Sequence, residues 1–169
     1  MARSSSAPKD VDRERSEFTE SMGQMLASFG LPPMASRIFA ALLVSSPAEQ
    51  SASDLAERLH ASRGSISTMT RMLEAPGLIE RVRKRGDRKT YYRVTPDGWY
   101  RAMQREADSM GAIRALAEIG ERLMRSEPPG ARRGIEDTVT FLRFWEREIG
   151  HVLSRWREHK AAQSTEESA

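Results

Sequence analysis

Apolar residues recur every three or four positions in the first part of the chain. They are Phe18, Met22, Met25, Leu26 and Phe29. This spacing predicts an amphipathic helix over residues 12–29, which Gly30 and the two prolines after Leu31 would end. A second helix, with Ile38 and Leu42 on one face, is expected to follow and to end near Ser46.

Two capping signals lie only eleven residues apart in the next segment. Ser51 and Asp54 have the spacing of a capping box, which predicts a short helix of about eight residues. Ser62 can cap another helix from Arg63 to about Ala75, where Pro76 and Gly77 force an end. Two short capped helices joined by two residues are typical of a helix-turn-helix.

Residues 78–84 and 89–95 are rich in Val, Ile, Thr and Tyr and predict two strands. The four residues between them include Gly86, which suits a tight turn, so a β-hairpin is expected. Helix, helix, turn, helix and hairpin is the order of a winged helix. The expected fold class is therefore mainly α with a small β-hairpin, a winged helix-turn-helix with long N- and C-terminal dimerisation helices.

Two long helices are expected after Pro96, one over residues 98–126 and one ending near Lys160. Helices this long with an apolar stripe usually bury it against a second copy in a chain of 169 residues. The expected divisions are a disordered tail at 1–10, an N-terminal dimerisation helix at 11–30, a winged-helix domain at 31–97, a C-terminal dimerisation region at 98–160 and a disordered tail at 161–169.

Composition excludes several classes of protein. Hydrophobic content of 38% with 30% charged residues is that of a soluble protein, no apolar run approaches a membrane span, and residues 1–10 lack the apolar segment of a secretory signal. We therefore expect a cytoplasmic protein with no membrane contact. With no cysteine, three scattered histidines and no catalytic motif, we expect no metal, no cofactor and no enzyme activity.

Basic charge is concentrated in the predicted hairpin. Residues 80–93 hold seven basic and two acidic residues, a local charge of +5 in a chain whose net charge is +3. A cationic patch of this kind suits a polyanion, because each neutralised phosphate releases condensed counterions. A solvated charged loop is the alternative for an arbitrary chain, so the residues that neighbour the hairpin must decide between the two interpretations.

A family resemblance appears at this point. The segments "SASDLAERLHASRGSISTMTRMLEAPGLIERV" and "GDRKTYYRVTPDGW" resemble the winged-helix core of MarR-type bacterial transcriptional regulators, and "FGLPPMASRIFAALL" resembles their GbsR-like branch. The resemblance covers about residues 29–99. It implies a DNA-binding homodimer, a repressor in our expectation, whose terminal helices form the interface and, in many members, a small-molecule pocket. Typical wings carry Asp-x-Arg, whereas Asp87 and Arg88 are adjacent here, which predicts a shorter wing.

The helix that begins at Arg63 is expected to read base edges of double-stranded DNA in the major groove. Its candidate contacts are Ser62, Arg63, Ser65, Ser67, Thr68 and Arg71, and those of the wing are Arg83, Lys84, Arg85, Arg88 and Lys89. Arg63 and Arg71 suit guanine, and the Thr68 methyl suits thymine. Arg88 suits a narrowed minor groove and the other wing cations suit phosphates. For Arg71, an ion pair with Glu74 or Glu80 is an equal alternative.

Aromatic and thioether side chains on the terminal helices present two further interpretations. They are Phe18, Met22, Met25, Phe141, Phe144, Trp145 and Trp156. Such a stripe usually packs in the core or in a dimer interface. The more specific hypothesis is that these side chains line an effector pocket for a lipophilic or quaternary ammonium compound. The alternative to DNA binding, for the chain as a whole, is a winged-helix module whose basic hairpin docks an acidic protein.

Overall fold

The computed structural model describes residues 8–166, and residues 1–7 and 167–169 lie outside the described part. Helix α1 (Pro8–Ser28) begins before residue 11, and α6 (Pro129–Glu166) continues past Lys160. Residues 8–10 and 161–166, expected to belong to disordered tails, are therefore helical. The chain forms two compact units, residues 1–101 and 102–169, of which each is described by itself.

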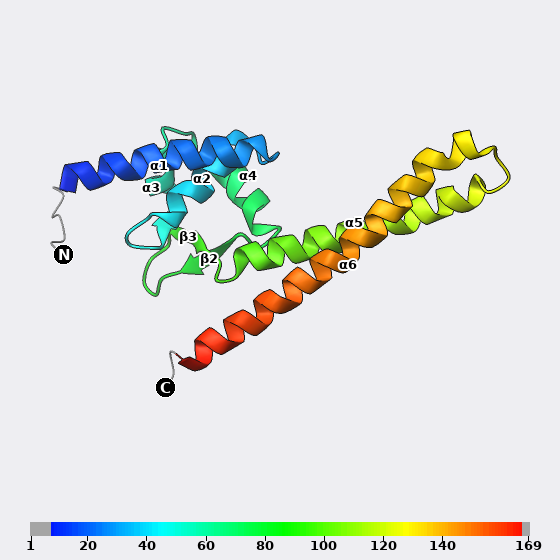
Figure 1. Cartoon of the computed structure of the whole chain (residues 1–169). Helices are drawn as coiled ribbons and strands as arrows, with labels where there is room; N and C mark the ends of the chain where they lie inside the picture. The colour runs from blue at the N-terminus through cyan, green and yellow to red at the C-terminus, as the bar shows by residue number, and fades with distance from the viewer. Residues whose placement is uncertain (1–7, 167–169) are drawn as a thin grey trace. The chain divides into compact units, whose positions relative to one another are not determined.

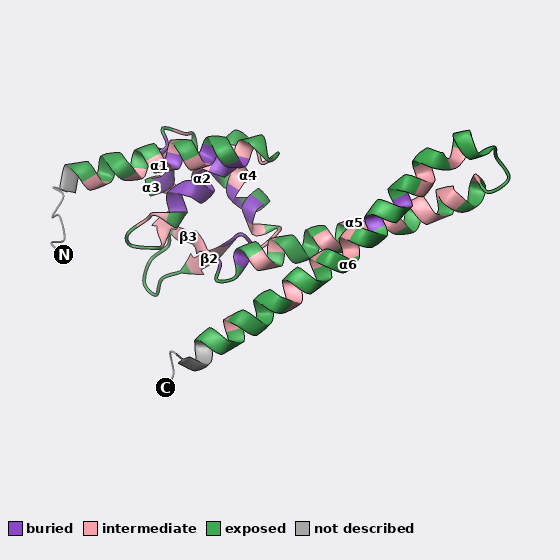
Figure 2. Ribbon diagram, in the orientation of Figure 1, coloured by how far each residue is buried: buried purple, intermediate pink, exposed green. Residues whose placement is uncertain are grey.

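The core of the first unit is built around α2 (Pro33–Leu43), which has apolar residues on most sides. Ile38, Phe39 and Ala41 are fully buried there, and Figure 2 shows the buried residues gathered on α2 and the helices around it. Burial of a side chain as large as that of Ile38 or Phe39 contributes about 1.5–3 kcal/mol. Trp99, at the start of α5 (Gly98–Leu123), and Phe39 pack as a T-shaped pair with ring centroids 5.5 Å apart.

Helix α1 packs closely against α2 at a glycine. A Cβ on Gly23 would lie 3.0 Å from the Arg37 side chain, so a larger residue would push the helices apart. Arg37 donates to Glu20 of α1 at 2.6 Å and to the carbonyl of Leu59 at 3.3 Å. The Arg37 guanidinium thus links α1 and α2 to Leu59, which lies just before the turn of the helix-turn-helix.

The helix-turn-helix consists of α3 (Ala52–Arg58) and α4 (Arg63–Glu74). Both arms of the predicted capping box are present, since Ser51 Oγ accepts from the Asp54 amide and Asp54 accepts from the Ser51 amide, each at 3.1 Å. Such a cap stabilises a helix by about 1 kcal/mol. Leu55, Ile66 and Leu73 direct the two helices onto the core.

A three-stranded antiparallel sheet completes the first unit, in the order β1-β3-β2. Strand β2 (Ile79–Arg83) pairs with β3 (Thr90–Val94), with Arg83 opposite Thr90, so the connecting loop has residues 84–89 rather than the four expected. Strand β1 (Gln50–Ser51) pairs with Tyr92 and Tyr91 and was not predicted. The predicted fold class, a mainly α winged helix, is confirmed.

The second unit is a helical hairpin in which α5 and α6 run antiparallel (Figure 1). Arg114 donates to Glu118 and to Glu146, and Arg143 donates to Glu118 at 3.0 Å. These bonds lower the pKa of Glu118, because the guanidinium groups stabilise its charged form. Val139 and Leu142 of α6 are buried, and a Cβ on Gly120 would lie 3.3 Å from Ile135.

Candidate nucleic-acid interface

Helix α4 presents a polar face opposite its buried one. Ser62 has extended backbone angles and its Oγ accepts from the Ser65 amide at 3.1 Å, which fixes the start of the helix. Gly77, with a φ of +78°, turns the chain away after the helix ends. Ile66, Thr70 and Leu73 face the core. Of the predicted contacts, Ser65 is half-buried and the rest are exposed: Ser62, Arg63, Ser67, Thr68 and Arg71.

The two carboxylates expected as alternative partners of Arg71 are bound by other arginines. Glu74 accepts two hydrogen bonds from Arg81, at 2.9 and 3.0 Å, which raise the pKa of Arg81. Glu80 accepts from Arg93 at 2.6 Å. Arg71 donates instead to the carbonyl of Ser67 at 3.2 Å, on its own helix. Its guanidinium is thus exposed on the polar face, without a salt bridge among the described residues.

Asp87 organises the tip of the wing. It accepts from the Lys89 amide at 2.8 Å and from the Tyr91 hydroxyl at 2.6 Å, while Gly86 supplies a φ of +82°. The Tyr91 bond, and after it the Lys89 bond, lower the pKa of Asp87. The bond to Asp87 in turn raises the pKa of Tyr91. Lys84 Nζ lies 4.2 Å from the centre of the Tyr91 ring, so the loop between the strands closes on itself.

Glu49, which sequence reasoning missed, divides the cations of the wing into two groups. It lies 3.8 Å from Lys84 Nζ and 3.7 Å from Arg93, so these two side chains are partly neutralised. The other predicted wing contacts have no salt bridge within the part of the chain that the structure describes: Arg83, Arg85, Arg88 and Lys89. These four residues, together with Arg63 and Arg71, are called the unpaired cations below.

A groove of about 420 Å³ lies between α4 and β3. Its lining comes from β1, α3, α4, the wing loop and β3: Ser51, Ala52, Ser53, Arg63, Ser67, Lys89, Thr90 and Tyr92. The structure thus brings Arg63 and Ser67, predicted on the helix, together with Lys89, predicted on the wing. Ser53 and Thr90 were missed, because their nearness to Arg63 depends on the sheet pairing and not on local sequence.

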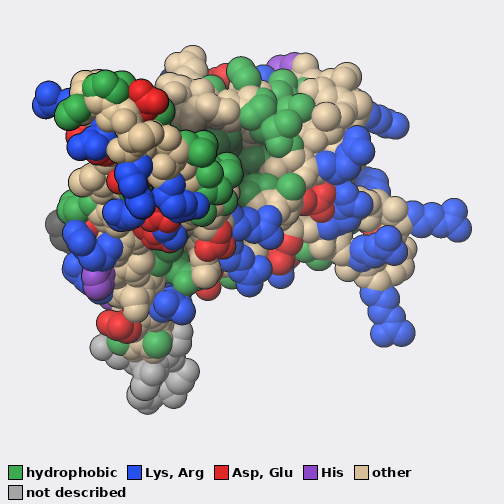
Figure 3. All heavy atoms as spheres, turned by 90° about the vertical axis from the view of Figure 1, so that its right-hand side faces the viewer, with side chains coloured by type: hydrophobic (Ala, Val, Ile, Leu, Met, Phe, Trp, Pro, Cys, Tyr) green, Lys and Arg blue, Asp and Glu red, His purple; other side chains and the backbone are tan. Residues whose placement is uncertain are grey.

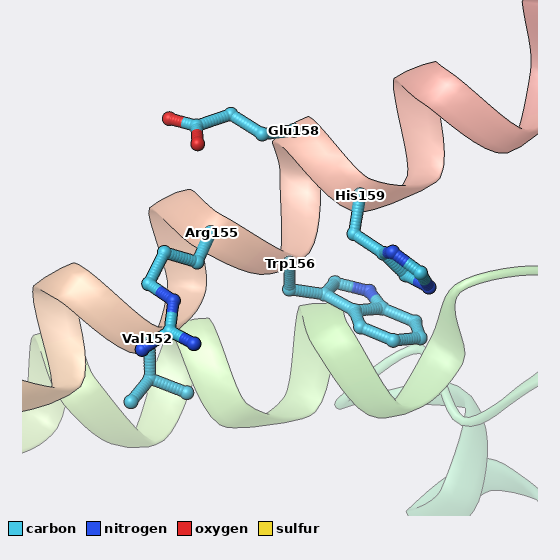
Figure 4. A pocket seen from close by; sticks show the side chains of 5 residues that line it. All are labelled: Val152, Arg155, Trp156, Glu158 and His159. Atoms are coloured by element: carbon cyan, nitrogen blue, oxygen red, sulfur yellow. The ribbon is translucent and has the colours of Figure 1, made fainter.

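The residues of the hypothetical effector pocket divide between the two units. Phe18, Met22 and Met25 lie on α1, and the remainder lie on α6. A groove of about 580 Å³ on α6 is lined by Val152, Arg155, Trp156, Glu158 and His159, with the Trp156 and His159 rings 5.7 Å apart (Figure 4). Of the seven predicted residues only Trp156 lines this groove, and the effector pocket stays a prediction.

Residues 8–166 contain neither a membrane-spanning helix nor a cluster of metal ligands. No helix among them has the length and apolarity that crossing a membrane requires. No three His, Cys, Asp or Glu side chains in residues 8–166 gather as metal ligands.

Comparison with known proteins gives concordant matches. The model of the MarR family matches residues 40–91, and a model described as an MmpR5-like MarR family transcriptional regulator matches residues 97–159. The HTH-type transcriptional regulator MmpR5 of Mycobacterium tuberculosis is 36% identical over 140 residues, which are 83% of this chain and 85% of that protein. A crystal structure described as a transcriptional regulator has 34% identity and a TM-score of 0.73, covering 86% of this chain and 99% of that one.

Proposed function

Because the chain belongs to the MarR family of DNA-binding transcriptional regulators, we propose that it binds a pseudo-palindromic site on double-stranded DNA as a homodimer. The observation that carries the proposal is the set of unpaired cations. They lie on the polar face of α4 and on the adjacent wing, where no carboxylate among the described residues forms a salt bridge with them. Six such groups on one helix and the hairpin that follows it suit the phosphates and base edges of a duplex.

Each element has a proposed role in this complex. Helix α4 enters the major groove, where Arg63 and Arg71 donate to guanine and the Thr68 methyl contacts thymine. Ser62, Ser65 and Ser67 supply hydroxyls at the start of the same helix. Arg88 enters the minor groove, and Arg83, Arg85 and Lys89 contact phosphates. Lys84 contributes less than the sequence predicted, because Glu49 already partly neutralises it.

Exposed apolar stripes on α5 and α6 support a homodimer. On α5 the stripe is Ile113, Leu116, Ile119 and Leu123, and on α6 it is Phe141, Phe144, Val152 and Trp156. At 100° per residue each set falls within an arc of about 120°. Figure 3 shows hydrophobic side chains at the surface, bordered by basic and acidic ones. A second copy would remove these stripes from water, and its α4 would read the second half-site.

The rival function, docking of an acidic protein, has less support. Interfaces between proteins are usually anchored by apolar and aromatic side chains at their centre. Among the described residues of α4, Met72 is the single large apolar side chain that is exposed. The rest of the exposed face offers hydroxyls and guanidinium groups, which suit base edges better.

Repression and a response to an effector extend the proposal. A dimer bound over a promoter would block transcription, and a lipophilic or quaternary ammonium compound would release it by favouring a different spacing of the two α4 helices. The GbsR-like branch, from which the quaternary ammonium candidate came, has no support in the two family models that match. A thermal-shift screen with lipophilic and with quaternary ammonium compounds tests the response to an effector and discriminates between the two classes.

Selection of bound sequences from random duplex DNA tests the main proposal. We expect an inverted repeat with half-site centres about 34 Å apart. Fluorescence anisotropy with the selected duplex should give a binding constant whose logarithm falls linearly with the logarithm of the salt concentration. A protein that binds no duplex in dilute buffer, or that enriches no sequence, would contradict the proposal.

A further inference from the structure

We propose that the groove between α4 and β3 is a seat for one backbone phosphate of each DNA half-site. Lys89 holds the phosphate, the Ser53 and Thr90 hydroxyls donate hydrogen bonds to it, and Arg63, whose donors serve the base edges, adds its positive charge from the groove lining. This inference rests on the proposed function, because its occupant is a phosphodiester of the bound duplex. It adds Ser53 and Thr90 to the interface and gives Lys89 one defined role.

The strand register places this seat on one face of the hairpin. Side chains alternate along a strand, so Thr90 and Tyr92 lie on the same face of β3, and Tyr91 and Arg93 lie on the other. Thr90 and Tyr92 line the groove. Directly opposite Thr90 in the β2–β3 ladder is Arg83, one of the unpaired cations, which therefore shares this face.

The charges near the hairpin favour an anion on the groove face and not on the other. Arg93, on the opposite face, pairs with Glu80 and Glu49. Lys84 pairs with Glu49. Arg63 and Lys89 form no salt bridge with any carboxylate of the described residues. A phosphate entering the groove therefore meets two cations that form no salt bridge within residues 8–166.

The hydroxyl groups of the groove are available as donors. Ser51 Oγ and Ser53 Oγ lie 2.8 Å apart, and Ser51 Oγ also accepts from the Asp54 amide. If Ser51 donates to Ser53, the Ser53 hydroxyl proton is left for a ligand. The carboxylate of Asp54 is occupied by the Ser51 amide at 3.1 Å. The lining thus offers two cations and several hydroxyl groups, which suit an oxyanion better than a metal ion.

The Lys89 backbone is held before any ligand arrives. Its amide donates to Asp87 at 2.8 Å, and Asp87 is held in turn by Tyr91. A lysine that extends from a fixed backbone loses less entropy when it grips a phosphate. Since Arg63 reads base edges from α4 and Lys89 holds a nearby phosphate from the wing, the two contacts would fix α4 and the wing on the duplex in one register. The phosphate contact itself positions the protein without reading sequence.

Single methylphosphonate substitutions, which remove the charge of one phosphate, test the seat. They are moved along each half-site of the duplex selected by the wild-type protein, and the affinity is measured by anisotropy. We expect one phosphate per half-site whose neutralisation weakens wild-type binding about tenfold or more. Lys89→Ala should bind the unmodified duplex more weakly, and neutralising that phosphate should then cost it no further affinity. Thr90→Val, which keeps the shape of the side chain, should reduce the loss of affinity caused by neutralising that phosphate.

Arg85→Ala is the matched control, because Arg85 is an unpaired wing cation that does not line the groove. It should weaken binding but keep the full penalty at the proposed phosphate. If the wild type binds the duplex and no phosphate loses its penalty in Lys89→Ala, the seat is wrong and the proposed function stands. A wild type that binds no duplex would overturn both. Circular dichroism of each variant separates loss of contact from loss of fold.

Discussion

Asp87 shows how one exposed carboxylate can order a cationic loop. Its pKa is lowered first by the Tyr91 hydroxyl and then by the Lys89 amide. A carboxylate whose pKa is lower in the folded than in the unfolded chain contributes stability above its unfolded pKa of about 4, and this contribution is lost as the pH falls through the folded pKa. The wing tip should therefore remain ordered at neutral pH and loosen only in acid.

An NMR titration of the Lys89 amide checks this prediction. The signal should move with a midpoint below about 4, and Tyr91→Phe should raise the midpoint because the largest stabilising bond is removed. Tyr100→Phe removes a hydroxyl elsewhere in the chain and should leave the midpoint unchanged. An identical midpoint in Tyr91→Phe and the wild type would show that the hydroxyl does not hold Asp87 in solution.

Arg63 and Arg85 should differ in what their loss does to DNA binding. Arg63→Ala should cost roughly 1–3 kcal/mol on the selected duplex and relax its sequence preference, because Arg63 is placed at base edges. Arg85→Ala should weaken all duplexes alike and reduce the salt slope by about 0.9 per site. Lys84→Ala should change the slope less, since Glu49 lies 3.8 Å from its ammonium group.

Anisotropy on the selected and on random duplexes, at several salt concentrations, separates these effects. Equal losses on both duplexes for Arg63→Ala would contradict a base-reading role. A Lys84→Ala slope change as large as that of Arg85→Ala would show that Glu49 releases Lys84 when DNA binds.

At the scale of residues, the sequence predicted where basic charge gathers but not which cations are free. The partner of Lys84 is Glu49, thirty-five positions away, and the two meet because β1 joins the sheet beside β3. Glu74 lies three residues from Arg71 but is bound by Arg81 after the chain turns back. Such pairings depend on tertiary approach, which local spacing does not encode.

At the scale of elements, the wing leads into α5 through a close contact between backbones. A Cβ on Gly98 would lie 3.0 Å from the Leu78 carbonyl oxygen and 3.1 Å from that of Gly77. Both are backbone atoms, so the chain itself must shift, at a cost of about 1–3 kcal/mol. We expect Gly98→Ala to lower the free energy of unfolding by this amount, as measured by urea denaturation.

Gly64, in the first turn of α4, is the matched control. The nearest atom to its added Cβ would be Ser62 Oγ at 3.9 Å, an ordinary contact. Because alanine favours a helix more than glycine does, Gly64→Ala should be neutral or stabilising by up to about 1 kcal/mol. Equal destabilisation of the two variants would mean that the close approach at Gly98 is not the cause.

The elements that the sequence predicted correctly have strong local signals. Ser51 with Asp54, and Ser62, mark the starts of α3 and α4 with side chains that bond the first free amides. Strand β1 has only two residues and no periodicity, so it exists through its pairing with Tyr91 and Tyr92. The end of α6 was placed too early because the residues after Lys160 include no proline or glycine to stop a helix.

At the scale of the whole molecule, the second unit has too little core for its length. Its ion pairs lie between α5 and α6, while Leu116 and Leu123 are 69% and 76% exposed and Phe141 is 61% exposed. Contiguous exposed apolar surface of this kind marks an interaction site. The periodicity predicted an apolar stripe on each of these helices, but which apolar residues α5 and α6 bury against each other depends on packing that a single sequence does not specify.

Leu116→Glu should therefore separate assembly from folding. A charge placed in the α5 stripe should shift the protein from dimer to monomer in light scattering, while the helical circular dichroism changes little because the position is exposed within the chain. Gln104→Glu, an exposed change on the same helix, should leave the dimer intact. Affinity for the full inverted repeat should fall sharply in Leu116→Glu, since each α4 must then bind its half-site alone, whereas affinity for an isolated half-site should barely change. A Leu116→Glu protein that stays dimeric with full affinity would place the interface on other residues.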